Sequence, residues 1–233
     1  MHLESRVMSH KILAYQVYYQ PKQKKNLQAG FVSYFNKKAT INQENEIIEH
    51  LISRPSAAQA EWFGVFSQAV RRKLNNFTFE RLREACQKHP EADILAPNPQ
   101  NYSFCDYIRK PHPLRYTLEK KQYETFVALL PKLGISPKIL RPSHVIYCNY
   151  FVAKPAIYKD YVDSILSPAM ELFRTDSELQ ELGMRRSHYN YKTPPANYTK
   201  DTGLKYYPHI PFILERLINV YIQLNQPKTK WVL

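Results

Sequence analysis

Residues 144–154 read HVIYCNYFVAK, an apolar run that a helical pattern follows from residue 155 to residue 173. Such a run predicts a buried strand that feeds a helix, with one amide, Asn149, inside the strand. An unpaired amide in an apolar strand costs about 1–3 kcal/mol, so Asn149 is expected to have a partner. A neighbouring backbone group is one candidate. The other is a ligand in the cleft at the strand ends of an α/β sheet, which Lys154 would also reach.

The overall composition is that of a globular protein. Of the 233 residues, 44% are hydrophobic and 23% are charged, and no apolar run reaches the roughly 18 residues that a bilayer span requires. This predicts a single domain over residues 1–233. Residues 1–10 lack an apolar segment of signal-peptide length, so a cytoplasmic protein is expected.

The net charge of +13 at pH 7 means that the surface attracts anions. Nucleic acid, anionic membrane lipid and a nucleotide-sugar diphosphate all fit this charge. The glycine loops that bind dinucleotides and triphosphates are both missing from the sequence. Neither a disulfide framework nor a zinc site is predicted from three widely separated cysteines, Cys86, Cys105 and Cys148, which are expected to be reduced.

The rest of the chain alternates between strand and helix patterns. Strands are expected at 11–20, 61–67 and 92–96, and helices at 42–53, 78–88, 121–130 and 211–224. Glu44 and Glu46 suit the start of the first helix because the helix dipole favours acids there. Pro131 and Gly134 are expected to end the third helix. The alternation predicts an α/β fold with a largely parallel sheet covered by helices. The polar region at about 175–208 is predicted to be a lid or loose excursion.

Two places in this pattern contain polar or charged residues that could bind a ligand. The strand at 61–67 leads into a hydroxyl and three cations, namely Ser67, Arg71, Arg72 and Lys73. The last helix is apolar almost all round but contains Glu215, and a buried carboxylate must be paired or protonated. Either an ion pair with a nearby arginine or lysine fixes the helix, or Glu215 faces the cleft as a base or as an anchor for sugar hydroxyls.

Six short motifs occur in order along the chain. They are residues 15–19 (YQVYY), 29–32 (AGFV), 62–67 (WFGVFS) with Lys73, 92–95 (ADIL), 148–154 (CNYFVAK) and 212–217 (FILERL). With these motifs, nearly the whole chain resembles a group of bacterial proteins, mostly uncharacterised. The group is related to the glycosyltransferase-like family found with capsular and other surface-polysaccharide genes.

The resemblance implies a GT-A-like fold, the fold of nucleotide-diphospho-sugar transferases. It also implies transfer of a sugar from a nucleotide-sugar donor to a saccharide or lipid-linked acceptor. Two departures from the family pattern are visible. A His-Tyr-Arg-Arg-like segment is replaced by residues 66–72 (FSQAVRR), and a His-Pro-Gly turn by residues 112–114 (HPL).

Glycosyl transfer from such a donor requires neutralisation of the leaving diphosphate, by a divalent metal on a D-x-D motif or by basic side chains. The sequence contains no D-x-D motif. The cations expected to offset the diphosphate charge are therefore Arg71, Arg72, Lys73 and Lys154. Manganese or magnesium would be the alternative cofactor.

Further candidates complete the predicted site. Asp93 and Asn98 lie where GT-A-like proteins often place donor-binding residues, so each would bind a ribose or sugar hydroxyl, or bond a nearby turn. His112 would act as a general base at neutral pH. Tyr18 and Tyr19 would stack on a base ring or pack in the core.

Three function classes follow from this reading. The first is a glycosyltransferase of surface-polysaccharide assembly, acting in the cytoplasm or at the inner face of the membrane, where a basic surface would meet anionic lipid. The second is a nucleic-acid-binding module that grips phosphates with basic groups and stacks bases on its 18 tyrosines. The third is a catalytically inactive GT-A-like protein that binds a saccharide or a partner enzyme.

Overall fold

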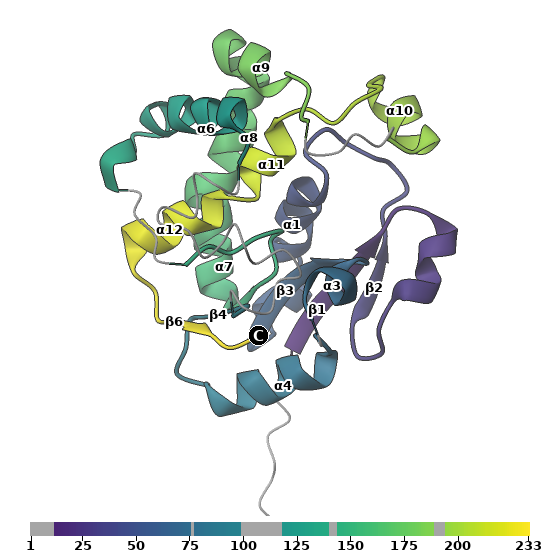
Figure 1. Ribbon diagram of the computed structural model, residues 1–233. Coiled ribbons are helices and arrows are strands. Elements are labelled where there is room, and N and C mark those ends of the chain that lie inside the picture. The colour runs from purple at the N-terminus through teal and green to yellow at the C-terminus, as the bar shows by residue number, and fades with distance from the viewer. Residues whose placement is uncertain (1–11, 76, 99–117, 140–143, 189–193) are drawn as a thin grey trace, which may run out of the picture.

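A computed structural model of the protein describes residues 12–75, 77–98, 118–139, 144–188 and 194–233 (Figure 1). In these ranges the strands form one sheet of six, in the order β2-β1-β3-β5-β4-β6. The strands are β1 (Ile12–Tyr18), β2 (Val32–Phe35), β3 (Trp62–Ser67), β4 (Ile94–Ala96), β5 (Val152–Ala153) and β6 (Thr229–Trp231).

Helices connect and cover these strands. The first half contains the 3-10 helix η1 (Pro21–Asn26), α1 (Glu44–Ile52), α2 (Pro55–Ala58), α3 (Val70–Lys73) and α4 (Phe79–Lys88). After the undescribed residues 99–117 come α6 (Lys120–Lys132), the 3-10 helix η4 (Pro137–Ile139), α7 (Pro155–Tyr161), the π-helical turn η5 (Val162–Leu166) and α8 (Ser167–Thr175). The remaining helices are α9 (Ser177–Gly183), α10 (Ala196–Thr202), α11 (Ile210–Leu214) and α12 (Leu217–Asn225).

The sheet is mixed. β1 pairs in parallel with β2 and β3, and β4 pairs in parallel with β6, whereas β5 runs antiparallel to both of its neighbours, β3 and β4. All the other strands described here therefore point the same way. The predicted α/β architecture is confirmed as a mixed six-stranded sheet with helices on both faces.

The alternation of side chains along the strands builds a core on each face of the sheet. Phe63 and Val65 of β3 pack into the larger core, whereas Trp62 and Phe66 pack into the smaller one. This is the two-residue period of a strand that is buried on both faces. Figure 1 shows α4 against one face, and α1, α7 and the later helices over the other.

The strand order changes direction between β1 and β3. β2 lies on one side of β1, whereas β3 and the strands beyond it lie on the other. The connections that leave β1 and β3 therefore diverge, and a crevice remains beyond the carboxyl ends of these strands. In open α/β sheets, ligands bind in the crevice at such a switch point. Here the crevice lies beyond Tyr18 and Ser67, the last residues of β1 and β3.

Many predicted elements are confirmed within a few residues. The strands expected at 11–20, 61–67 and 92–96 are β1, β3 and β4, and the helices expected at 42–53 and 78–88 are α1 and α4. The helical pattern at 155–173 corresponds to α7, η5 and α8 and extends to Thr175. Neither β2 nor β6 was predicted. Both are short strands at the two edges of the described sheet.

The predicted strand through residues 145–152 is wrong. Only Val152–Ala153 form a strand, because the backbone before them turns at Cys148 (φ 61°) and Asn149 (φ 56°). Two successive residues with positive φ cannot lie in a β-strand. Among non-glycine residues, asparagine tolerates this conformation best.

One further expectation needs correction. The helix expected at 211–224 is divided into α11 and α12 by a break at Glu215 and Arg216. The helix expected at 121–130 is α6, which includes Pro131 but ends at Lys132, before Gly134 (φ 74°). The described residues of the region at 175–208 include α9 and α10.

Candidate functional site

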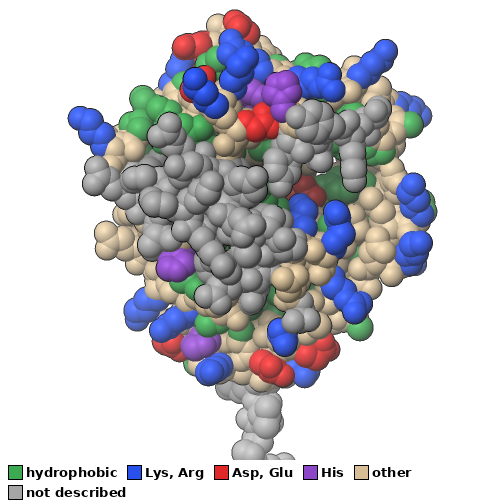
Figure 2. Space-filling view, viewed as in Figure 1, with side chains coloured by type: hydrophobic (Ala, Val, Ile, Leu, Met, Phe, Trp, Pro, Cys, Tyr) green, Lys and Arg blue, Asp and Glu red, His purple; other side chains and the backbone are tan. Residues whose placement is uncertain are grey.

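A cavity of about 550 Å³ lies at the crevice between β1 and β3. We call it the central cavity. Tyr19 and Ser67 reach it from the ends of β1 and β3, Lys73 from α3, Glu44 from the start of α1, and Glu215 from the break between α11 and α12. Figure 2 shows a hollow on this face, with acidic and hydrophobic side chains deep inside and lysine or arginine side chains at its rim.

Two carboxylates face the central cavity in different surroundings. Glu215 pairs with the fully buried Arg216, with Nη1 and Oε2 3.2 Å apart, and 15% of its side chain is exposed. No ion pair of Glu44 is found within the described ranges. Burial, followed by the charge of Glu215, raises the pKa of Glu44 above its usual value.

Lys73 is the cation that faces these acids. Its ammonium group donates to Cys148 Sγ over 3.2 Å and lies 5.7 Å from the centre of the Tyr150 ring. Burial raises the pKa of the Cys148 thiol to about 12, so the thiol is neutral at pH 7 and a weak acceptor. An ammonium group has three donors. Lys73 therefore keeps donors for an anion in the cavity.

The charge of Lys73 depends on its neighbours. Burial lowers the pKa of Lys73, whereas Cys148, Tyr150 and Glu215 raise it. Burial also raises the pKa values of Cys148 and Tyr150, so both are neutral at pH 7. Glu215 is therefore the one of these three groups that favours the charged form of Lys73 at neutral pH.

Aromatic and hydroxyl groups form much of the remaining wall. The tyrosines that line the cavity are Tyr19, Tyr147, Tyr150 and Tyr207. The hydroxyls of Tyr150 and Ser67 lie 2.5 Å apart, which fixes both side chains. Burial, followed by the charge of Glu44, raises the pKa of Tyr19 well above its usual value, so its hydroxyl stays protonated. Rings with polar tips suit a ligand that is partly apolar and rich in hydroxyls.

Backbone strain is concentrated around the central cavity. Four described residues other than glycine have positive φ. Gln43 (φ 52°) and Cys148 (φ 61°) line the cavity, and Asn149 follows Cys148 directly. Such conformations cost about 1–3 kcal/mol each and cluster at functional sites.

A buried polar layer holds this strained turn in place. The Asn219 amide accepts from Ile146 N over 2.7 Å and donates to Ile146 O over 3.0 Å. Arg216 lies over the Tyr147 ring, 3.8 Å from its centre. The Asn149 amide donates to Asn45 Oδ1 over 3.1 Å. The partner of Asn149 is thus a side chain of α1 and not a backbone group.

The structure brings five of the predicted site residues into one cavity, Tyr19, Ser67, Arg72, Lys73 and Glu215. Arg71 lies apart from them. It lines a neighbouring cavity of about 660 Å³ that Arg72 also reaches. The three cations of α3 therefore face two cavities, because successive residues of a helix point about 100° apart.

Other predicted site residues lie away from the central cavity. Asp93 Oδ2 accepts from Lys228 N over 2.9 Å and so holds the start of β6. Lys154 lies over the Trp62 ring, 4.0 Å from its centre. Tyr18 stacks on Phe35 of β2, with ring centres 5.0 Å apart.

Two more predicted site residues also lie outside the central cavity. Asn98 lines a separate cavity near the end of β6, where its backbone N–H donates to Leu233 O. Asn149 is buried beneath the turn, where it contributes to positioning. His112 and Cys105 lie outside the described residues.

Glu44 is the main site residue that sequence reasoning missed. An acid at the start of a helix is common because the helix dipole favours it, so the pattern gave no reason to single it out. The structure adds what the sequence lacks, a break between α11 and α12 that brings Glu215 into the same cavity.

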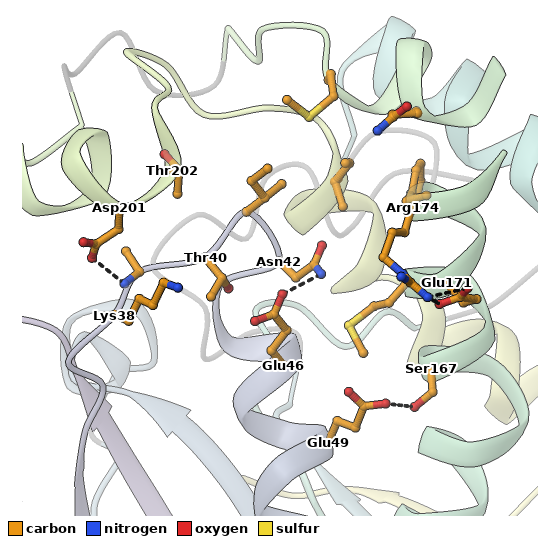
Figure 3. A pocket seen from close by; sticks show the side chains of 17 residues that line it. Lys38, Thr40, Asn42, Glu46, Glu49, Ser167, Glu171, Arg174, Asp201 and Thr202 are labelled. Atoms are coloured by element: carbon orange, nitrogen blue, oxygen red, sulfur yellow. Dashed lines mark hydrogen bonds and ion pairs between the residues drawn. The ribbon is translucent and has the colours of Figure 1, made fainter. Parts of the chain in front are cut away.

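A third cavity, of about 570 Å³, lies between the start of α1 and α8 (Figure 3). Its polar side chains largely satisfy one another. Asn42 donates to Glu46 over 2.9 Å, Ser167 donates to Glu49 over 2.6 Å, and Arg174 pairs with Glu171.

Within the described ranges, no three His, Cys, Asp or Glu side chains gather in a way that could hold a metal ion. Two basic side chains, Arg72 and Lys73, line the central cavity and can supply the counter-charge for an anion. In the same ranges, no helix has the length and apolar character needed to cross a bilayer.

No protein-family model and no curated protein match the sequence. A solved structure, the apo form of the bifunctional glycosyltransferase WbbM, is similar over 94% of this chain, at 16% sequence identity and a TM-score of 0.47. The similar region covers 44% of the WbbM chain, so this chain spans less than half of that protein's length.

Proposed function

We propose that this protein is a glycosyltransferase-like enzyme with a GT-A-like fold. It transfers a sugar from a nucleotide-sugar donor to a saccharide or lipid-linked acceptor in surface-polysaccharide assembly. One observation carries the proposal: two carboxylates and a lysine with spare donors meet in a cavity at the switch point of the sheet. The motifs that resemble surface-polysaccharide proteins supply lining residues from four separate places, Tyr19, Ser67, Tyr150 and Glu215.

In the proposed reaction, Glu44 is the general base. It takes the proton of the acceptor hydroxyl as the acceptor oxygen bonds to the anomeric carbon of the donor sugar. The bond from that carbon to the diphosphate oxygen breaks, and the diphosphate leaves with the electron pair. Lys73 and Arg72 stabilise the charge that develops on it.

The surroundings of the two acids support this division of roles. A carboxylate with a raised pKa is a stronger base near neutral pH, and burial with the charge of Glu215 gives Glu44 this property. Glu215 is held by Arg216 and suits the binding of sugar hydroxyls.

The tyrosines support this function over nucleic-acid binding. Base stacking requires exposed rings, but many tyrosines are core residues. Tyr158, Tyr161 and Tyr221 are each at most 1% exposed. The net charge of +13 fits a diphosphate ligand equally well.

Titration with nucleoside diphosphates and nucleotide sugars, with and without manganese, tests the proposal. We expect these ligands to raise the Tm of the wild-type protein, and a saccharide acceptor to release nucleoside diphosphate from the matching donor. The Glu44→Gln variant should bind the donor but lose about 10²–10⁴-fold in turnover.

Two outcomes would overturn the proposal. Tight, salt-dependent binding of oligonucleotides without any response to nucleotides would indicate a nucleic-acid-binding module. Binding of saccharides without turnover of any donor would indicate an inactive binding protein.

A further inference from the structure

The cavity beside the central cavity is strongly basic. We call it the basic cavity, and it has a volume of about 660 Å³. Lys25 of η1 and Arg71 and Arg72 of α3 line it, against a single acid, Glu80. None of the three cations makes an ion pair within the described part of the chain. Their charges are therefore free to attract an anion.

Amide groups add uncharged donors to this cavity. The Gln28 Nε2 group is buried and has no hydrogen-bond partner within the described ranges, although the backbone N–H of Gln28 donates to Gln16 Oε1 over 2.8 Å. Asn26 Nδ2 donates to Gln68 Oε1 over 3.0 Å and ties η1 to the end of β3. A buried amide donor without a partner is costly, and a ligand oxygen would satisfy it. Cations together with an amide donor fit a phosphate group.

The basic cavity adjoins the central cavity. Gln68, Ala69 and Arg72 line both. Lys73 lines only the central cavity, and Arg71 lines the basic cavity but not the central one. The two cavities therefore contain separate sets of cations, with Arg72 between them. One set is sufficient for a leaving diphosphate, which leaves the other for a second anionic group.

We propose that the basic cavity binds a diphosphate group separate from that of the sugar donor. Its role rests on the proposed function: it would hold the diphosphate of an acceptor while the acceptor's hydroxyl reaches Glu44. Arg72 then lies between two anionic groups and favours their simultaneous binding. The chemistry of the site is that of a diphosphate, whether free or carried on a lipid.

Calorimetric titration with inorganic pyrophosphate tests this site. The background is Lys73→Met, which weakens binding in the central cavity. Adding Arg71→Gln should weaken the remaining pyrophosphate binding about 10-fold or more, because a charge-assisted contact is lost. Arg83→Gln, on the exposed face of α4, is the matched control for charge and should have little effect. Equal weakening by both substitutions would overturn the proposal, because only the general positive field would then attract pyrophosphate.

A competition experiment separates the basic cavity from the donor site. With the wild-type protein saturated by a nucleoside diphosphate, pyrophosphate should still bind, and Arg71→Gln should weaken this binding about 10-fold or more. Complete displacement of pyrophosphate by the nucleotide would overturn the proposal, since both cavities would then serve one ligand.

The two proposals can fail independently. If no nucleotide binds but Arg71→Gln still weakens pyrophosphate binding selectively, the basic cavity stands and the proposed function fails. Geranyl diphosphate serves as a second probe. Tighter binding than pyrophosphate would assign a lipid-linked diphosphate, and equal binding would assign the diphosphate group alone.

Discussion

Glu44 and Glu215 show how two identical groups acquire different properties from their neighbours. Glu215 has a buried arginine beside it, whereas Glu44 is surrounded by a tyrosine, a second carboxylate and the protein interior. The pKa of Glu44 is raised for this reason. Because folding raises this pKa, the folded protein binds the proton of Glu44 more tightly than the unfolded chain does.

The raised pKa of Glu44 predicts a stability that depends on pH. The contribution is fully present below the unfolded pKa of about 4.3 and is lost as the pH rises through the higher folded pKa. Glu44→Gln removes this loss, so its Tm should exceed that of the wild type at pH 7 and match it at pH 4. The exposed Glu84→Gln makes the same change in net charge and serves as the control. A Tm difference between Glu44→Gln and wild type that stays constant with pH would contradict the prediction.

Lys73 is predicted to carry much of the affinity for a diphosphate. Lys73→Met should weaken the binding of nucleoside diphosphates about 10–100-fold, because a charged hydrogen bond contributes about 1.5–3 kcal/mol. Lys230→Gln lies in the edge strand β6, away from β1 and β3. It removes the same charge and should leave the affinity nearly unchanged. EDTA should have no effect, since basic side chains supply the counter-charge. Strong inhibition by EDTA, with no effect of Lys73→Met, would show that a metal supplies it instead.

At the scale of elements, the hydrophobic period predicted helices correctly but missed the turn before β5. The patterns at 42–53 and 78–88 gave α1 and α4 because a helix that covers a core repeats its apolar residues every three or four positions. Period carries no information on the sign of φ. The apolar run before β5 therefore resembled a strand, although Cys148 and Asn149 turn the chain. The asparagine inside the run was the one sign of the turn.

The break between α11 and α12 was hidden for a different reason. Leu214 and Leu217, which flank Glu215 and Arg216, are apolar and buried, as in one continuous buried helix. The break is stabilised by long-range contacts, in which Arg216 lies over Tyr147 and Asn219 bonds Ile146. Contacts between residues some 70 positions apart leave no signal in a local pattern. The break that places Glu215 at the central cavity therefore could not be predicted from the sequence.

Asn219 is predicted to stabilise the turn on which the central cavity depends. Asn219→Ala leaves two buried backbone groups of Ile146 without their partner, at a cost of about 1–3 kcal/mol for each group. The urea concentration at the midpoint of unfolding should fall accordingly. Asn225→Ala, exposed on the same helix α12, should change it little. Similar midpoints for the two variants would mean that the hydrogen bonds of Asn219 do not stabilise the turn.

At the scale of the whole molecule, the closeness of β3 and β5 sets a limit on side-chain size. A Cβ atom on Gly64 would lie 2.6 Å from Val152 Cγ1 and 2.9 Å from Phe151 O. Gly64→Ala should therefore destabilise the protein by about 1–3 kcal/mol. Adding Val152→Ala should recover part of this loss, because it removes the side-chain clash but leaves the carbonyl in place. Thermal unfolding of the two single variants and the double variant measures the coupling. If the effects of the two single substitutions on stability add up in the double variant, the predicted clash between Gly64→Ala and Val152 is contradicted.

The position of β5 has a consequence for the newly made chain. β3 and β4 are both synthesised before the strand that joins them, which follows β4 by roughly sixty residues. At a translation rate of about 5–20 residues per second, several seconds pass before that strand emerges from the ribosome. Until then β3 and β4 each present an open edge, which can pair with another nascent chain. Chains that stall or terminate before residue 152 are therefore the species most prone to aggregate in the cell.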